Sequence, residues 1–250
     1  MFRYKILRWI IISSMCNSVY AALIPADTFS SPELTAALGA SWLNAGNTNL
    51  HVSPYETDAL KVTGLSTDIV WRAGVGVHVL KEKLAARQYF NDLSLQLNFY
   101  NSAATINGNV WQYQLPQFNN YTFHASATNS RLMLDLKPSL LTYNGFTPYL
   151  IGGIGLGWNS IGYYENASVA GVPTGSNYLL RRQTSLNTTY DVGAGIKHQI
   201  TPHLAATLEY EYTYLGRMSP WPSSSAIALV SPPHFTLSTQ NLFAGINWQI

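Results

Sequence analysis

Hydrophobic and polar residues alternate along most of the chain. In one stretch Leu132, Leu134 and Leu136 share one face, while Arg131 and Asp135 share the other. Alternation of this kind places successive side chains on opposite sides of a β-strand. It therefore predicts one strand for each segment that shows it, and these segments lie at about 33–43, 67–80, 91–100, 127–141, 147–158, 184–199, 203–215 and 237–250.

The length and the charges of these segments favour a membrane-spanning barrel over a β-sandwich. Most run to ten residues or more, the length that a tilted strand needs to cross a bilayer, whereas sandwich strands usually have ~5–6 residues. Full charges stand in mid-segment on one face, where a sandwich core would not accept them. A barrel with a lipid-facing wall and a polar lumen accepts both faces. We predict an all-β fold, an eight-stranded antiparallel up-and-down transmembrane β-barrel.

The connections between the segments alternate in length. Short links are expected at about 81–90, at 142–146 with the turn pair Asn144-Gly145, and at 200–202. Long loops at one end and short turns at the other are typical of outer-membrane barrels. The long loops are predicted at about 44–66, 101–126, 159–183 and 216–236.

Aromatic residues near the segment ends suggest the two girdles that such barrels carry at the membrane interfaces. The expected girdle residues are Trp42, Tyr100, Trp158 and Tyr214 beside the long loops, and Tyr143, Tyr149 and Trp248 beside the short turns.

The composition and the N-terminus support export to a membrane. Only 10% of residues are charged, against ~25% in soluble domains. Arg3, Lys5 and Arg8 precede an apolar run, and 19–21 is a small-x-small cleavage site. We expect residues 1–21 to be a cleaved signal peptide and 22–250 to be the barrel domain. Removal of the signal peptide takes away three of the 14 basic residues and none of the 12 acidic ones, which leaves 11 basic and 12 acidic residues. This balance excludes a basic nucleic-acid-binding surface.

Three stretches carry a resemblance to a known family. Residues 147–155, Thr-Pro-Tyr-Leu-Ile-Gly-Gly-Ile-Gly, resemble the Pro-Tyr-x-x-Gly-x-Gly strand of opacity-like outer-membrane proteins. These proteins share their architecture with the transmembrane domain of outer-membrane protein A. Residues 191–212 resemble the sixth and seventh strands of the opacity-like family. The end of the chain resembles the assembly signal read by the barrel-insertion machinery, although Ile250 replaces the usual Phe or Trp; its residues are Leu242, Ala244, Ile246, Trp248 and Ile250.

The mid-strand charges are the main candidate for chemistry. In a barrel of about eight strands the side chains just fill the interior, so opposite charges should pair there and plug the lumen. The alternative is a narrow ion path. The residues with inward parity are Asp68, Arg72, Arg131, Asp135, Lys137, Asp191, Lys197, Glu209 and Glu211.

Signals for an enzyme are weak. His124-Ala125-Ser126 resembles the His-x-Ser motif of outer-membrane lipid A deacylases, but the following Asn is missing and Asp135 should point inward. The six histidines are scattered and suggest no metal site. We expect no catalytic residue, no metal and no cofactor.

The leading hypothesis is a non-enzymatic barrel in the outer membrane of a Gram-negative bacterium, contributing to envelope integrity and surface contact. The alternatives are a small, low-conductance porin and, less favoured, a lipid-modifying enzyme. Expected partners are outer-membrane lipid and lipopolysaccharide, the insertion machinery, and a host or surface ligand. The loops suit such a ligand because they combine aromatic and amide side chains, as in 111–113, 119–121, 163–164 and 220–222.

Overall fold

The computed structural model describes residues 29–79, 90–171, 179–221 and 229–250. The expected signal peptide, residues 1–21, and most of the link at 81–90 lie outside these ranges. Within them, no helix has the length and the apolar character needed to cross a membrane. The strands are β1 (Phe29–Ala45), β2 (Thr48–Ser53), β3 (Glu56–Leu65), β4 (Thr67–Val79), β5 (Asp92–Trp111), β6 (Asn119–Ser139), β7 (Phe146–Ala167), β8 (Leu179–Thr201), β9 (Leu204–Met218) and β10 (Phe235–Gln249).

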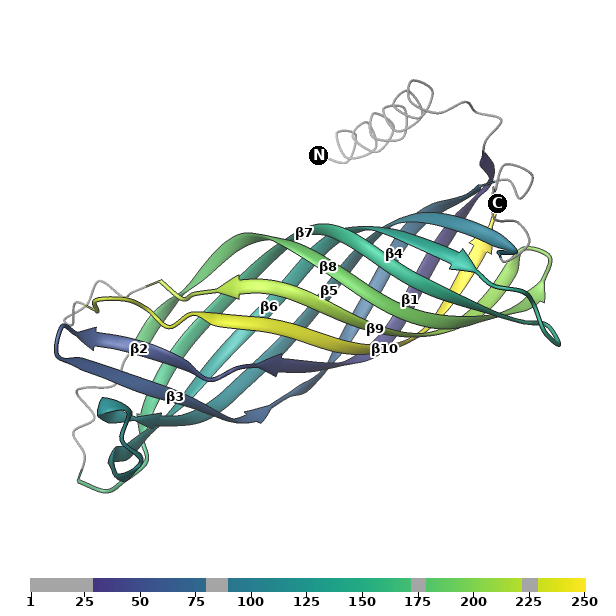
Figure 1. Ribbon diagram of the computed structural model, residues 1–250. Coiled ribbons are helices and arrows are strands. Elements are labelled where there is room, and N and C mark those ends of the chain that lie inside the picture. Colours follow the sequence, from purple (N-terminus) through teal and green to yellow (C-terminus); the bar gives the residue numbers. More distant parts are fainter. Residues whose placement is uncertain (1–28, 80–89, 172–178, 222–228) are drawn as a thin grey trace, which may run out of the picture.

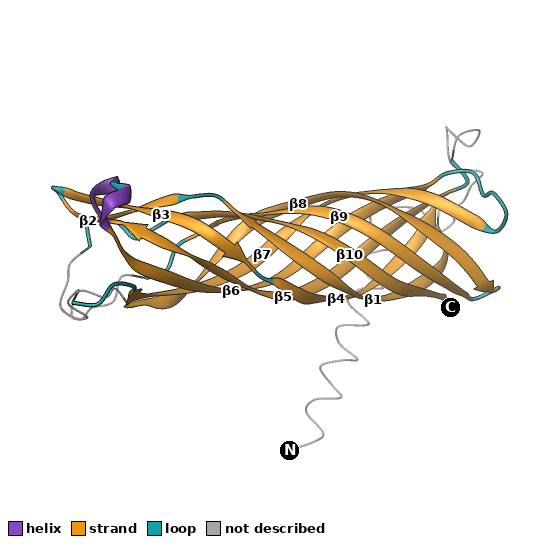
Figure 2. Ribbon diagram, turned by 90° about the horizontal axis from the view of Figure 1, so that it is seen from below, coloured by secondary structure: helices purple, strands orange, loops and turns teal. Residues whose placement is uncertain are grey.

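Eight of the ten described strands form a closed antiparallel ring, which confirms the predicted fold (Figures 1 and 2). The order around the ring is β1-β4-β5-β6-β7-β8-β9-β10, and β10 closes on β1 in a continuous register that includes Leu38 opposite Ala244. The remaining pair, β2 and β3, is a hairpin outside the eight-strand order: β3 pairs with the far part of β5, beyond the part that pairs with β4. Closure leaves the ring without a free sheet edge.

The two described short turns lie as predicted. Asn144 and Gly145 have φ angles of 48° and 79°, the left-handed conformation that a tight two-residue hairpin turn requires and that Asn-Gly supplies at low cost. The second turn joins β8 to β9 at 202–203, slightly further along the chain than the predicted 200–202. Both turns lie at the same end of the barrel as the C-terminus (Figure 1).

Three of the four predicted long loops are largely strand where they are described, and this part of the prediction is wrong; in the fourth, 216–236, the described strand residues are 216–218 and 235–236. The range 44–66 holds β2 and β3, while β5 and β6 extend through most of 101–126 and are joined by two short 3-10 turns, η3 (Gln112–Gln114) and η4 (Pro116–Phe118). Likewise β7 continues to Ala167, β8 begins at Leu179 and β9 reaches Met218. These extra segments prolong the barrel at the end away from the short turns (Figure 1).

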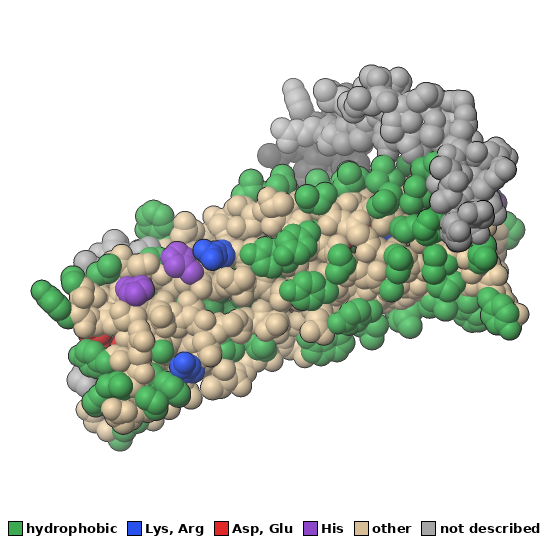
Figure 3. Space-filling model, viewed as in Figure 1, with side chains coloured by type: hydrophobic (Ala, Val, Ile, Leu, Met, Phe, Trp, Pro, Cys, Tyr) green, Lys and Arg blue, Asp and Glu red, His purple; other side chains and the backbone are tan. Residues whose placement is uncertain are grey.

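Exposed apolar side chains form a belt around the half of the barrel nearer the short turns (Figure 3). Leu38, Ile69 and Ile154 are examples, with 59%, 71% and 60% of their surface exposed. A wall of this kind is stable where it meets lipid. We call this half the belt and the remainder of the barrel the extension.

The two faces of β6 exchange polarity where the belt ends. Odd-numbered residues are buried along almost the whole strand. Within the belt the buried residues include Arg131 and Asp135 and the exposed ones are leucines, whereas in the extension Phe123 and Ala125 are buried and Ser126 is exposed. The strand is therefore continuous, but its surroundings change from lipid to water.

The extension has an apolar core inside the barrel. Phe123 stacks on Tyr163 with ring centroids 5.6 Å apart, and Phe235 lies 6.2 Å from Phe123. Aliphatic side chains from β2, β3, β5 and β7 complete the cluster, among them Leu50, Leu60, Ile106, Val110 and Ile161. The lumen is thus polar within the belt and apolar in the extension.

Two of the predicted girdle aromatics are not on the outer wall. Tyr100 is fully buried in the lumen and Tyr149 is 4% exposed, and an added Cβ at Gly195 would lie 2.5 Å from the Tyr149 ring. Both residues have inward parity, so their place in the strand outweighs their aromatic character. The other five are at least partly exposed, as Trp42, Tyr143, Trp158, Tyr214 and Trp248.

Candidate functional site: the charged lumen

A network of buried charges crosses the lumen within the belt. Arg72 projects from β4 and donates to Glu209 on β9 through Nη1 to Oε2 at 2.6 Å and Nη2 to Oε1 at 2.7 Å. The same Nη1 lies 2.6 Å from Oε1 of Glu211, and Nζ of Lys137 lies 3.1 Å from Oε2 of Glu209. The network links β4, β6 and β9, which are not neighbours in the ring.

Aromatic rings cover the arginines of this network. The guanidinium carbon of Arg72 lies 5.1 Å from the ring centroid of Phe243 and 5.6 Å from that of Tyr100. The guanidinium carbon of Arg131 lies 4.1 Å from the centroid of the same Tyr100 ring. Such contacts are worth about 2 kcal/mol or more when desolvated, so the rings stabilise cations that burial would otherwise penalise.

A second cluster lies where β6, β7 and β8 meet. Asp135 accepts hydrogen bonds from Nδ2 of Asn98 at 2.6 Å and from Oη of Tyr100 at 3.0 Å. Gly153 lies opposite both Asp135 and Asp191 in the ladders, and an added Cβ there would collide with each carboxylate. Among the described residues, neither carboxylate oxygen of Asp191 has a hydrogen-bond partner. The glycine makes room for two acidic side chains on one side of the lumen.

The structure brings together seven of the nine charges predicted for the lumen: Arg72, Arg131, Asp135, Lys137, Asp191, Glu209 and Glu211 are all buried within the belt. Asp68 instead accepts a hydrogen bond from Ser66, away from this network. Lys197 lies at the short-turn end, where its side chain is 18% exposed and its Nζ is 3.8 Å from Asp92.

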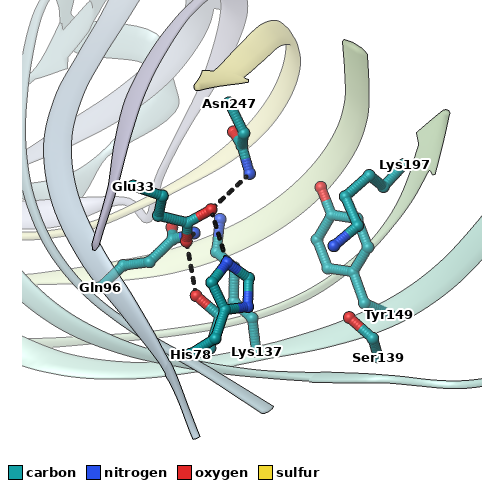
Figure 4. Close-up of a pocket in the computed structure, with 9 residues that line it drawn as sticks. Glu33, His78, Gln96, Lys137, Ser139, Tyr149, Lys197 and Asn247 are labelled. Carbon is teal, nitrogen blue, oxygen red and sulfur yellow. Dashed lines mark hydrogen bonds and ion pairs between the residues drawn. The ribbon is translucent and has the colours of Figure 1, made fainter. Parts of the chain in front are cut away.

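A third cluster, the mouth cluster of Glu33, His78 and Asp92, was missed by the sequence analysis as a set; Figure 4 shows two of its members, Glu33 and His78. Nε2 of His78 lies 3.1 Å from Oε2 of Glu33, and Nδ1 lies 2.6 Å from Oδ2 of Asp92. Ser94 donates to Glu33 Oε1 at 2.6 Å. His78 could have been assigned to the lumen from the sequence, because it has the same inward parity as Arg72. Glu33 was harder to recognise, because it stands at the start of its segment and no other charged residue in that segment shares its face.

Glu33 and His78 of the mouth cluster line a small cavity that Lys137, Tyr149 and Lys197 also border. Its volume is about 10 Å³, which is roughly the space for the centre of one water molecule. The ion pairs therefore leave no wide passage at this end.

The residues of the deacylase-like motif lie on the outer wall of the extension, and their described contacts include no carboxylate. His124 Nδ1 is 2.6 Å from Oδ1 of Asn107, and its ring stacks on Tyr164 at 5.0 Å. Ser126 Oγ accepts a hydrogen bond from Arg182, and Asp135 is in the lumen. A nucleophile needs a base and an orienting group within reach, and the described contacts do not supply that arrangement.

The residues of the expected assembly signal lie on the outward face of β10 and at the chain end: Leu242, Ala244, Ile246, Trp248 and Ile250 are exposed. The described residues contain no group of three or more His, Cys, Asp or Glu side chains arranged to hold a metal ion.

Comparisons with known proteins agree with this architecture. The model of the outer membrane protein β-barrel domain family matches residues 12–248. Similar solved structures include Neisserial surface protein A (14% identity, 89% of this chain and 99% of that chain, TM-score 0.44) and OprG from Pseudomonas aeruginosa (13%, 89% and 97%, 0.46). Ail of Yersinia pestis is also similar (10%, 88% and 100%, 0.38).

Comparison with curated proteins finds no match. The family match spans almost the whole chain and includes all the described strands except the last residue of β10. The protein belongs to the outer membrane protein β-barrel domain family and is located in the outer membrane of a Gram-negative bacterium.

Proposed function

We propose that the protein is a non-enzymatic surface barrel with a sealed lumen, and that it makes contacts outside the cell through its extension. The observation that carries this proposal is the filling of the lumen at two levels. Buried ion pairs centred on Arg72 occupy the belt, and apolar side chains around Phe123 occupy the extension. Such a barrel suits a scaffold better than a channel.

The far end of the extension offers the contact surface. Tyr55, in the turn between β2 and β3, is 95% exposed, and Tyr113 and Phe118 at the β5–β6 connection are 54% and 41% exposed. Tyr113 and Gln114 have φ angles of 53° and 61°. Strain of this kind in residues other than glycine is often kept at functional sites, and exposed aromatic side chains are enriched in interfaces.

Asp58 supports this end. Its Oδ1 accepts a hydrogen bond from the backbone N–H of Tyr113 at 3.0 Å. Burial raises the pKa of Asp58 to about 6, the charge of Glu56 acts in the same direction, and the Tyr113 hydrogen bond opposes both. A buried carboxyl group thus helps to hold a strained tyrosine at the exposed tip.

The test compares surface contact of cells that display the wild-type barrel with cells that display Tyr55→Ser/Tyr113→Ser. Attachment to host cells and to neighbouring bacteria is scored, and the double variant is expected to lose most of it. Tyr143→Ser is the matched control, since Tyr143 is 77% exposed at the opposite end. The proposal would be ruled out if all three proteins gave equal attachment, or if wild-type cells attached no better than cells that lack the barrel.

A low-conductance porin is the second candidate. The mouth cavity, bordered by Lys137 and Lys197, is the feature that favours it. The two candidates differ in conductance, which the filled belt is expected to suppress.

A further inference from the structure

The outer wall of the extension carries two consecutive arginines at an irregularity in the sheet. In the ladder between β7 and β8, Ile161 lies opposite Gln183 but Tyr163 lies opposite Leu180. Arg181 and Arg182 therefore both face the single residue Gly162, an arrangement that corresponds to a β-bulge. Leu180 stays in the apolar core, while both arginines are exposed. The bulge adds a second basic side chain to the outer wall.

Arg182 lies flat across the wall. Its Nη2 donates to Ser126 Oγ at 2.6 Å, and its Nη1 lies 3.3 Å from Thr128 Oγ1 and 3.5 Å from the carbonyl oxygen of Ser160. Gly162 lies directly beside this arginine: an added Cβ there would be in van der Waals contact with Cβ of Arg182 at 3.7 Å and with Oγ of Ser126 at 3.8 Å. A guanidinium has five N–H donors, so the fixed arginine keeps donors for a ligand, and the two hydroxyl groups can donate as well.

No described acidic side chain neutralises this region from outside. Of the acids on β3 and β7, Asp58 and Glu165 are buried, with 2% and 4% of their surface exposed, and Glu56 is half-buried at the start of β3. Arg181, Arg182 and Arg217 are exposed. The outer wall of the extension therefore complements an anion.

The height of Arg182 on the barrel matches the polar layer of a membrane. Ser130 lies opposite Trp158, an exposed aromatic at the edge of the belt, and Thr128 and Ser126 follow two and four residues further along β6. At about 3.3 Å per residue and a tilt of about 35–45°, the guanidinium lies roughly 5–10 Å beyond the belt. The polar layer of a bilayer is about 5–8 Å thick on each side.

We propose that Arg182, together with Ser126 and Thr128, binds a phosphate group of a glycolipid in the leaflet around the extension. The guanidinium supplies the paired N–H groups that match phosphate oxygens, and the hydroxyl groups surround it. The acyl chains of the same lipid would lie against the apolar wall below. This site is independent of the contact proposed at the far tip of the extension.

The test uses the full barrel in nanodiscs that contain either a phosphorylated lipid A or the same lipid with its phosphates removed. Lipid retained through purification is counted by native mass spectrometry, and affinity is measured by titration. Wild-type protein should retain the phosphorylated form preferentially, and Arg182→Gln should weaken its binding about tenfold or more. Gly162→Val, which keeps every charge but adds a branched side chain against Cβ of Arg182 and Oγ of Ser126, should also weaken it.

Arg217→Gln is the control, because Arg217 is exposed elsewhere on the extension. Folding of each variant is verified by heat-dependent migration on a gel. Equal retention of the two lipids, unchanged binding by Arg182→Gln, or an equal loss with Arg217→Gln would overturn the site. Inorganic phosphate that binds as tightly as the glycolipid would also overturn it, by showing an anion site without lipid preference.

Discussion

The guanidinium of Arg72 and the carboxylate of Glu209 meet inside the lumen in a two-pronged hydrogen bond, with N–O distances of 2.6 and 2.7 Å. Both side chains are 1% exposed, and Glu211 shares the same guanidinium. Because the bond joins β4 to β9, it ties together strands that share no ladder. Arg72 thus pairs with two buried acids at once, and Lys137 adds a second cation beside Glu209.

Replacement of this arginine should be costly. Arg72→Met leaves Glu209 and Glu211 buried with Lys137 as the remaining close cation, and we expect the free energy of unfolding to fall by about 3–5 kcal/mol. Urea unfolding in lipid vesicles measures the change. Arg72→Met combined with Glu211→Gln should recover part of the loss, since Glu209 then keeps its ion pair with Lys137 and Glu211 carries no charge.

Lys197→Met is the control for this series. Lys197 is partly exposed and 3.8 Å from Asp92, so its loss should cost less than about 1 kcal/mol. Equal costs for Arg72→Met and Lys197→Met would show that the lumen network is not a structural plug.

The exchange of polarity along β6 predicts two different outcomes for one kind of substitution. Leu134→Lys, on the belt, should destabilise the barrel by about 2–4 kcal/mol in a bilayer. Thr122→Lys is also outward on β6 but lies in the extension, and it should change stability by less than about 0.5 kcal/mol. Vesicle-based unfolding of both variants is the measurement. A similar cost at both positions would place the extension within the membrane.

The extension should be more stable in mild acid. Because folding raises the pKa of Asp58 to about 6, the folded state binds a proton that the unfolded state does not between about pH 4 and pH 6. Its stability should therefore rise by about 1 kcal/mol as the pH falls from 7 to 5. Hydrogen exchange in 56–65 and 111–118, corrected for intrinsic rates, measures this change.

Asp58→Asn keeps an acceptor for the Tyr113 N–H but cannot ionise. It should protect these segments at pH 7 and abolish the pH dependence. If the variant and the wild type respond alike to pH, Asp58 is not the responsible group.

The sequence predicted the belt well, because lipid on one side and a polar lumen on the other enforce strict alternation over 127–141 and its counterparts. It failed where the belt ends. In 121–127 the apolar residues move to the opposite parity, as Tyr121, Phe123 and Ala125 show. A pattern search that assumes one polarity reads such a reversal as the end of a strand, and so it predicted loops.

The candidate site was predictable in part for the same reason. Parity located Arg72, Asp135 and Glu209 in the lumen, but it could not show which charges pair, because pairing depends on strands far apart in the chain. Glu33 and His78 are joined across β1 and β4, a proximity that register alone reveals. Tyr100 was assigned to the girdle from its residue type, whereas its parity places it inside.

Single-channel recording of the refolded barrel in a planar bilayer tests the sealed lumen most directly. We expect no steady conductance from wild-type protein whose folding is confirmed by heat-dependent gel migration, because ion pairs around Arg72 and the apolar core around Phe123 block the path in series. Steady channels whose conductance changes with Lys137→Ala or Glu209→Ala would contradict it and establish the lumen as an ion path.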